Sequence, residues 1–208
     1  MDHFTPKLWL GMTATPDKRD DNVEGRNVYE IFNYQIAYEI RLQQAMEENL
    51  LCPFHYFGIT DLSMIGDEEA ARDFNMLTSD ERVRHIVNQA DYYGYSGDKV
   101  KGLIFCSNIK ETEELSAKFN QIINPATGKN FRTVALNGSA SEQERQDAFE
   151  RLAMNEDESS EDRQPLDYIF SVEILNEGVD IVEVNQVIML RPTQSPIVFI
   201  QQLGRGLR

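Results

Sequence analysis

The sequence predicts an α/β protein in which a parallel sheet carries helices on both faces. Two observations lead to this prediction. Short continuous apolar runs, each about as long as a strand buried on both faces, recur between residues 102 and 190. The segments between these runs show the helical spacing of apolar residues, and several begin with a capping residue. Strands and helices that alternate in this way favour parallel βαβ connections.

The first sixty residues carry the weaker patterns. They predict three strands, a polar loop, one short element that is either a helix or a strand, and one helix. We expect a buried strand at 8–12, a loop at 17–25, a short helix or strand at 27–32, a strand at 35–40, a helix at 41–49 and a strand at 50–60, interrupted early by Pro53.

The signals are stronger after residue 78. Three helices are predicted from paired capping residues at the spacing of a capping box, which are Thr78 with Glu81, Asn108 with Glu111, and Ser141 with Glu144. Strands are predicted at 102–106, 131–136, 166–171 and 186–190, and a last helix at 195–203. The acidic insert at 155–164 is expected to be a solvated, mobile loop.

Composition excludes several classes of protein. The 208 residues include 20 Lys and Arg against 35 Asp and Glu, a net charge of −15, which excludes nucleic-acid binding by bulk positive charge. The longest apolar stretches have four residues, whereas a membrane-spanning helix needs about 20. No secretory signal is visible, and Cys52 and Cys106 lie in apolar segments. We therefore expect a cytoplasmic protein with two buried thiols and no membrane partner.

Four polar segments carry candidate chemistry. Each lies at or beyond the end of a predicted strand or in the last helix, and open parallel sheets bind ligands beyond the carboxyl ends of their strands. They are Thr13-Ala14-Thr15, Ser107-Asn108 with its later counterpart around Gly138, the stretch from Val172 to Ile181 that holds Gly178 and Asp180, and Gln201 to Arg208 with Arg205. Taken singly, the first three also fit plain turns and helix caps. Arg205 and Arg208 are three residues apart, a spacing that places both guanidinium groups on one face.

Together and in this order, the segments resemble the later motifs of superfamily 2 helicases. Residues 13–15 resemble motif III, 103–108 motif IV with 137–145 as its companion, 177–180 motif V, and 201–208 motif VI. The similarity is to DEAD/DEAH-type helicases related to the motor subunits of type I and type III restriction enzymes, and it covers nearly the whole chain. It implies a RecA-like fold of the P-loop NTPase type and an ATP-dependent helicase or translocase.

The resemblance also implies roles for individual residues. Arg205 and Arg208 would be catalytic arginine fingers. ATP would be bound by these two arginines and by Gly178, Asp180 and Gln201, with ATP and Mg²⁺ held mainly by the first motor domain. The nucleic acid would be contacted by Ser107, Asn108, Gly138 and Ser171, and the two motor domains would be coupled through Thr13 and Thr15. Val172 departs from the pattern, because many relatives have a phosphate-binding Thr there.

The sequence lacks the phosphate loop Gly-x-x-x-x-Gly-Lys-Ser/Thr, since Gly128-Lys129 has Ile123 and Asn130 at the flanking positions. We therefore expect residues 1–45 to be a remnant of the first motor domain and residues 50–208 to be the second domain, truncated after motif VI. Alone, the chain is expected to have negligible ATPase activity. The restriction-enzyme likeness favours DNA over RNA.

Two other hypotheses stay open at this point. A non-catalytic RecA-like module that docks onto a protein partner is favoured by the acidity and by the missing phosphate loop, and is disfavoured by the intact motif at 201–208. An enzyme with a Rossmann-like fold and another chemistry rests only on the alternation of elements. The oligomeric state is left open, including pairing of residues 1–45 with a second copy.

Overall fold

The computed structural model describes residues 7–13, 28–59, 74–172, 184–191 and 196–204. The chain divides into two compact units, Met1–Leu51 and Cys52–Arg208, which are described separately below. Among the described residues, no helix combines the length and apolar character that crossing a membrane requires.

The first unit contains two short helices, α1 (Val28–Ile31) and α2 (Leu42–Glu47). The strands predicted at 8–12 and 35–40 are wrong, because the described residues of this unit form no strand. Leu8 and Met12 are about nine-tenths exposed. An apolar run becomes a strand only when a neighbouring strand pairs with it, and a lone pair of strands is itself marginal in water.

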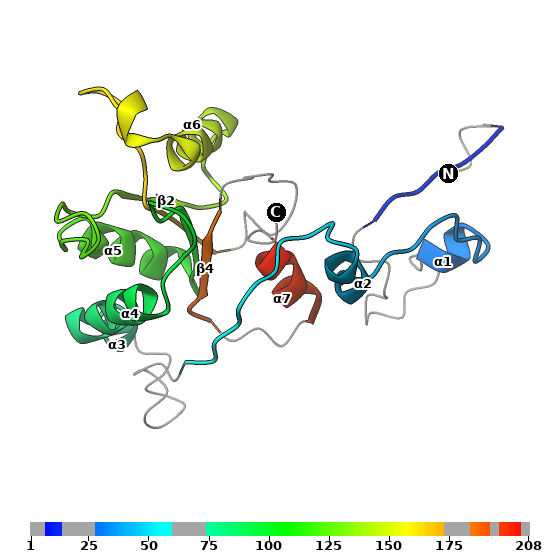
Figure 1. Ribbon diagram of the computed structural model, residues 1–208, viewed down its shortest axis with the longest axis horizontal. Coiled ribbons are helices and arrows are strands. Elements are labelled where there is room, and N and C mark those ends of the chain that lie inside the picture. The colour runs from blue at the N-terminus through cyan, green and yellow to red at the C-terminus, as the bar shows by residue number, and fades with distance from the viewer. Residues whose placement is uncertain (1–6, 14–27, 60–73, 173–183, 192–195, 205–208) are drawn as a thin grey trace. The chain divides into compact units, whose positions relative to one another are not determined.

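The second unit is built on a parallel sheet (Figure 1). Its described strands are β1 (Gly102–Phe105), β2 (Thr133–Leu136), β3 (Tyr168–Ser171) and β4 (Gln186–Met189). They lie in the order β2-β3-β1-β4, and every neighbouring pair is parallel. The four strands predicted after residue 101 are therefore confirmed, each within a few residues of its expected bounds.

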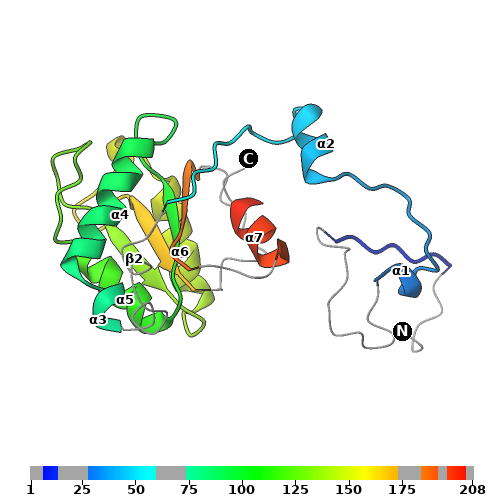
Figure 2. The same cartoon turned by 90° about the horizontal axis from the view of Figure 1, so that it is seen from below.

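Helices cover both faces of this sheet (Figure 2). Helices α4 (Asp80–Tyr93) and α5 (Ile109–Phe119) pack on one face, and α6 (Glu142–Ala153) packs on the other. The unit also contains α3 (Phe74–Leu77), the 3₁₀ turn η3 (Glu156–Glu158) and α7 (Pro196–Leu203). Alternate residues of β1 and β3 point to opposite faces. Ile104 and Phe170 join the core with α4 and α5, whereas Leu103 and Ile169 join the core with α6.

Two of the three predicted helix caps are confirmed. The side-chain oxygen of Asn108 accepts a hydrogen bond from the Glu111 N–H, and Ser141 forms a complete capping box with Glu144. The prediction that Thr78 caps the helix that follows it is wrong. Helix α4 begins one residue later, and the Ser79 hydroxyl accepts from the N–H of Arg82 at 3.2 Å.

The strand predicted at 50–60 is also wrong over its described part. Residues 52–59 form no ladder with β4, whose pairing partner is β1. Pro53 has no N–H to give to a ladder, and Tyr56 and Phe57 are largely exposed. Cys52 lies in this segment and is exposed, so the expectation of two buried thiols holds only for Cys106.

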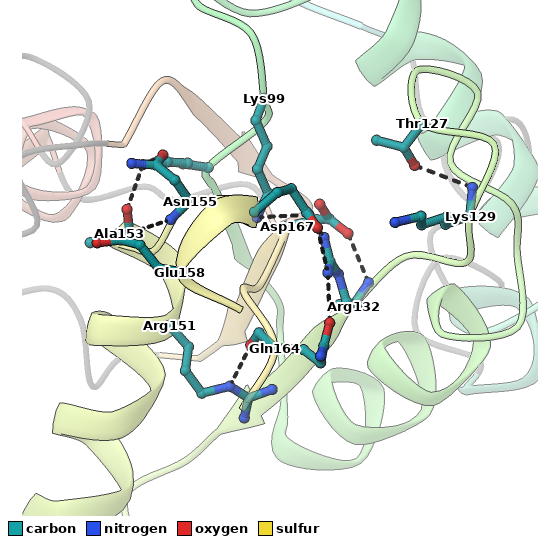
Figure 3. Close-up of polar contacts among 12 residues, drawn as sticks. Lys99, Thr127, Lys129, Arg132, Arg151, Ala153, Asn155, Glu158, Gln164 and Asp167 are labelled. Atoms are coloured by element: carbon teal, nitrogen blue, oxygen red, sulfur yellow. Dashed lines mark hydrogen bonds and ion pairs between the residues drawn. The ribbon is translucent and has the colours of Figure 1, made fainter. Parts of the chain in front are cut away.

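The amino ends of the strands form an edge, here called the amino edge, that is closed by polar side chains (Figure 3). Lys101, Arg132, Asp167 and Asn185 each precede a strand. One Asp167 carboxylate oxygen accepts from the Arg132 N–H at 2.8 Å, and the Asn185 side-chain oxygen accepts from the Lys101 N–H at 2.8 Å. Burial is the main cause that raises the pKa of Asp167 and lowers the pKa of the neighbouring Lys99.

The acidic insert is solvated, as expected, because residues 155–162 are exposed, and polar contacts attach its two ends to the rest of the unit. Arg132 forms an ion pair with Glu156. The Lys101 ammonium donates to the Ala153 carbonyl at 2.6 Å and to the Asn155 side chain at 3.3 Å. Further along, the Arg151 side chain donates to the carbonyl of Gln164 at 2.9 Å (Figure 3). Basic residues of the amino edge and of α6 thus hold both ends of the insert.

Candidate nucleic-acid interface

The predicted nucleic-acid residues come together at the opposite edge of the sheet, here called the carboxyl edge. In the strand register Ser171 lies beside Phe105 on one side and Leu136 on the other, so β1, β2 and β3 end at the same level. The turns that hold Ser107, Asn108 and Gly138 therefore leave the sheet side by side with the end of β3. The sheet order places β3 between β2 and β1, which makes this a continuous row.

The turn between β1 and α5 is organised by the side chains around it. The Asn108 side-chain oxygen accepts from the Glu111 N–H at 2.9 Å, and a Glu111 carboxylate oxygen accepts from the Ser107 N–H at 2.7 Å. Ser107 and Asn108 are exposed. Helix geometry leaves the N–H groups of Ile109 and Lys110 without acceptors inside α5. These two donors, the Ser107 hydroxyl and the exposed Lys110 ammonium suit a phosphate group.

The turn between β2 and α6 is closed by its own hydrogen bonds. The Asn137 side-chain oxygen accepts from the Ser139 N–H at 2.9 Å, and the Arg145 guanidinium donates to the Ala140 carbonyl at 3.0 Å. Gly138 is exposed, and a Cβ added there would meet no atom within 4 Å. The protein itself therefore does not require a glycine at this position, and the space above it is open to a ligand backbone.

The start of α6 differs electrostatically from the start of α5. The Glu144 carboxylate accepts from the Ser141 N–H at 2.7 Å and from its hydroxyl at 2.8 Å. The backbone hydrogen bond is the main cause that lowers the pKa of Glu144, which lies exposed at the surface. An exposed carboxylate at a helix start competes with a phosphate for the same positive potential. The α5 start is therefore the better phosphate site of the two.

Other predicted residues have a mixed outcome. Ser171 stands at the carboxyl edge but is fully buried, so its hydroxyl lies beneath the surface. Gln201 is half-buried in α7, and Thr13 is exposed in the first unit. The remaining predicted residues lie outside the described part of the chain: Thr15, Gly178, Asp180, Arg205 and Arg208.

An ion pair that sequence reasoning missed lies beneath the β1–α5 turn. Arg82 and Glu111 have side chains that are 1% and 0% exposed, and their nitrogen and oxygen atoms are 2.7 Å apart. The signal for Arg82 was present, because it lies four residues before Ile86 on the apolar face of α4. A charged residue on such a face is rarely buried without a partner.

The described residues of this edge include neither an exposed thiol nor a group of side chains suited to a metal ion. Burial is the main cause that raises the pKa of the Cys106 thiol, which lies at the end of β1 and is fully buried. Within the described ranges, no three His, Cys, Asp or Glu side chains are grouped as metal ligands would be. The polar groups of this edge are therefore suited to hydrogen bonding with an anion.

A parallel sheet covered by helices, with polar turns at its carboxyl edge, is the RecA-like architecture that the motifs predicted. The model of the helicase conserved C-terminal domain family matches residues 81–208, which is more than half of the chain. The chain belongs to this family, and the predicted likeness to the C-terminal domain of superfamily 2 helicases is confirmed.

One solved structure shares this fold, and a second is less similar. A fragment of a putative HsdR subunit of a type I restriction enzyme from Vibrio vulnificus YJ016 is 22% identical, with a TM-score of 0.71. The match covers 100% of this chain and 38% of that chain. Domain 2 of the DEAD-box helicase Mss116p, bound to an RNA duplex, is 17% identical with a TM-score of 0.44, and the match covers 64% of this chain and 44% of that chain. Among curated proteins, none matches the chain.

Proposed function

We propose that residues 52–208 act as the second motor domain of an ATP-dependent helicase or translocase that works on DNA. The observation that carries the proposal is the family match over 81–208, which runs through the carboxyl edge and through the proposed finger residues Arg205 and Arg208. The chain spans 38% of the length of the restriction-enzyme fragment that it resembles. A first motor domain with a phosphate loop is the required partner, and residues 1–45 are assigned to it.

The nucleotide is proposed to lie between the two motor domains, with Mg²⁺ held by the first. The donor set of this chain fits a nucleotide. Arg205 and Arg208 offer planar, permanently charged guanidinium groups to the phosphates, Gln201 offers an amide, and Asp180 accepts from a ribose hydroxyl beside Gly178. ATP supplies a phosphoryl group whose transfer to water builds up negative charge, and an arginine finger stabilises that charge. Such a finger raises the rate by about 10³–10⁵-fold.

The nucleic-acid backbone is proposed to follow the carboxyl edge. One phosphate binds the start of α5 through the N–H groups of Ile109 and Lys110 and the Ser107 hydroxyl. The Asn108 side chain caps the Glu111 N–H and leaves those two N–H groups to the phosphate. The next part of the backbone passes over Gly138, where no side chain obstructs it. Thr13 and Thr15 are proposed to form hydroxyl hydrogen bonds that change with the bound nucleotide and so couple the two motor domains.

The decisive experiment measures ATP hydrolysis with and without a first motor domain. The 208-residue chain alone should show negligible hydrolysis, even with single-stranded DNA present. With the first domain supplied, DNA should stimulate turnover, and Arg205→Ala should lower it by about 10³-fold or more while DNA binding is retained. Lys129→Ala is the matched control, because it removes one exposed cation far along the chain from the motif.

Four outcomes would contradict parts of the proposal. Robust hydrolysis by the chain alone would refute the division of labour between two domains. Normal turnover in Arg205→Ala would refute the finger assignment. Absence of hydrolysis in every combination would favour the docking-module hypothesis. A labelled RNA oligonucleotide that binds more tightly than DNA of the same sequence would overturn the choice of DNA.

A further inference from the structure

We propose that Arg82 and Glu111 form a positioning pair, which makes the β1–α5 turn able to bind a phosphate and ties that turn to the end of β4. The inference rests on the proposed function, because the phosphate is that of the nucleic acid at the carboxyl edge. Neither residue touches the nucleic acid. Both act through the backbone of the turn.

Glu111 performs two tasks with one carboxylate. One oxygen accepts from the Ser107 N–H at 2.7 Å and fixes the turn, while the other accepts from the Arg82 guanidinium at 2.7 Å. The Glu111 N–H is also the donor to the Asn108 cap. A residue at the third position of α5 thus determines the backbone path of both predicted contact residues.

Arg82 makes this arrangement compatible with an anionic ligand. A lone carboxylate beneath the turn would repel a phosphate, and a buried charge without a partner would be strongly unfavourable. The guanidinium cancels that charge from the interior side, so the N–H groups of Ile109 and Lys110 keep their positive potential toward solvent. At α6 the corresponding Glu144 is exposed at the helix start.

The same guanidinium also joins separate elements. It donates to the Leu77 carbonyl, ahead of α4, at 2.5 Å and to the Leu190 carbonyl, after β4, at 3.4 Å. The Leu190 N–H in turn donates to the Phe105 carbonyl at the end of β1 at 2.8 Å. Since β4 leads along the chain to α7 and Gln201, the pair connects the nucleic-acid turn with the strand that precedes the nucleotide motif.

A stabilising role alone does not require these charges. Apolar side chains of similar size usually serve a buried site as well as an ion pair does, or better. The double variant Arg82→Met with Glu111→Met therefore separates the two explanations. It removes both charges of the pair together and deprives the Ser107 N–H of its acceptor.

The test compares thermal stability with binding of a labelled single-stranded DNA oligonucleotide, using the 208-residue chain. The double variant should keep a cooperative melting transition and bind the oligonucleotide roughly tenfold more weakly. The matched control is Lys118→Met with Asp80→Asn. It removes another ion pair between α4 and α5, with a 2.6 Å separation, and should leave affinity unchanged.

The outcomes are distinguishable. A stable double variant with wild-type affinity would refute the positioning pair alone. A wild-type chain that binds no oligonucleotide would refute the proposed nucleic-acid contact, and the positioning pair with it. If the double variant does not fold, Glu111→Gln and Arg82→Lys provide the answer. Each variant keeps part of the hydrogen bonding, so each should weaken oligonucleotide binding while the melting temperature changes little. Wild-type affinity in both variants would overturn the proposal.

Discussion

Replacing Gly102 by alanine tests the packing of the sheet against the α4–α5 core. Gly102 is the first residue of β1 and pairs with Tyr168 of β3. A Cβ added at Gly102 would lie 2.2 Å from Cδ1 and from Cε1 of the Tyr168 ring. Carbon atoms in contact are normally about 3.5–4.0 Å apart. The ring would therefore have to move by about 1 Å or more.

The ring has little freedom to move. Tyr168 is 3% exposed, and its hydroxyl donates to the Gln186 side chain at 2.6 Å. The rings of Phe119 and Phe131 pack against it with centroids at 6.0 and 5.8 Å. Overpacking of this kind costs about 1–3 kcal/mol, and the anchored ring favours the upper end. For a unit of this size, about 3 kcal/mol corresponds to a melting temperature lower by about 6–12 °C.

The assay is thermal unfolding followed by circular dichroism, with Gly58→Ala as the control. A Cβ at Gly58 would meet nothing within 4 Å, so that variant should be neutral or slightly stabilised. In a Tyr168→Ala background the cost of Gly102→Ala should largely disappear, because the clashing ring is gone. A melting temperature unchanged by Gly102→Ala, or a full cost that persists without the ring, would refute the reasoning.

Three further predictions concern the core, a helix cap and the thiols. Leu152→Ala, at a fully buried position of α6, should destabilise the protein by about 2–5 kcal/mol in denaturant unfolding, and a loss below about 1 kcal/mol would contradict the packing of that face. The Ser141 N–H lowers the pKa of Glu144, so the ionised carboxylate stabilises the folded protein at pH values above its ordinary pKa of 4.5. This stabilisation is lost as the pH falls through the pKa of Glu144 in the folded protein. The melting temperature of wild type should therefore exceed that of Glu144→Gln at neutral pH, and the two melting temperatures should converge in acid. A thiol reagent should modify exposed Cys52 in the native protein and Cys106 only after unfolding, and equal rates for the two would contradict the burial of Cys106.

Local patterns predicted the second unit well because its elements carry their own signals. The run from Leu103 to Cys106 is apolar on both faces, and Asn108 and Ser141 each begin a helix with their own side chains. The strand predictions at 8–12 and 50–60 failed for a different reason. An apolar run indicates that a segment has side chains to bury, but it does not identify the strand that would pair with it.

The sequence proposed residues for the candidate site, but it could not predict how they are arranged. The motifs identified Ser107, Asn108 and Gly138, but the placement of β3 between β1 and β2 is a tertiary result. That placement buries Ser171, which the pattern presented as a contact residue. The sequence pattern of α4 did not predict the role of Arg82, because that role depends on Glu111, which is 29 positions away.

The location of the acidic insert has an electrostatic consequence. The insert is held at the amino edge, and each strand between the two edges has four residues, a length of about 13 Å. The Debye length is about 8 Å at physiological ionic strength but about 30 Å at 0.01 M salt. In the cell, the negative charge of the insert is therefore largely screened from a nucleic-acid strand bound, as proposed, at the carboxyl edge. In very dilute buffer the electric field of the insert would reach the nucleic-acid strand. It would then oppose the rise in nucleic-acid affinity that usually follows when salt is removed.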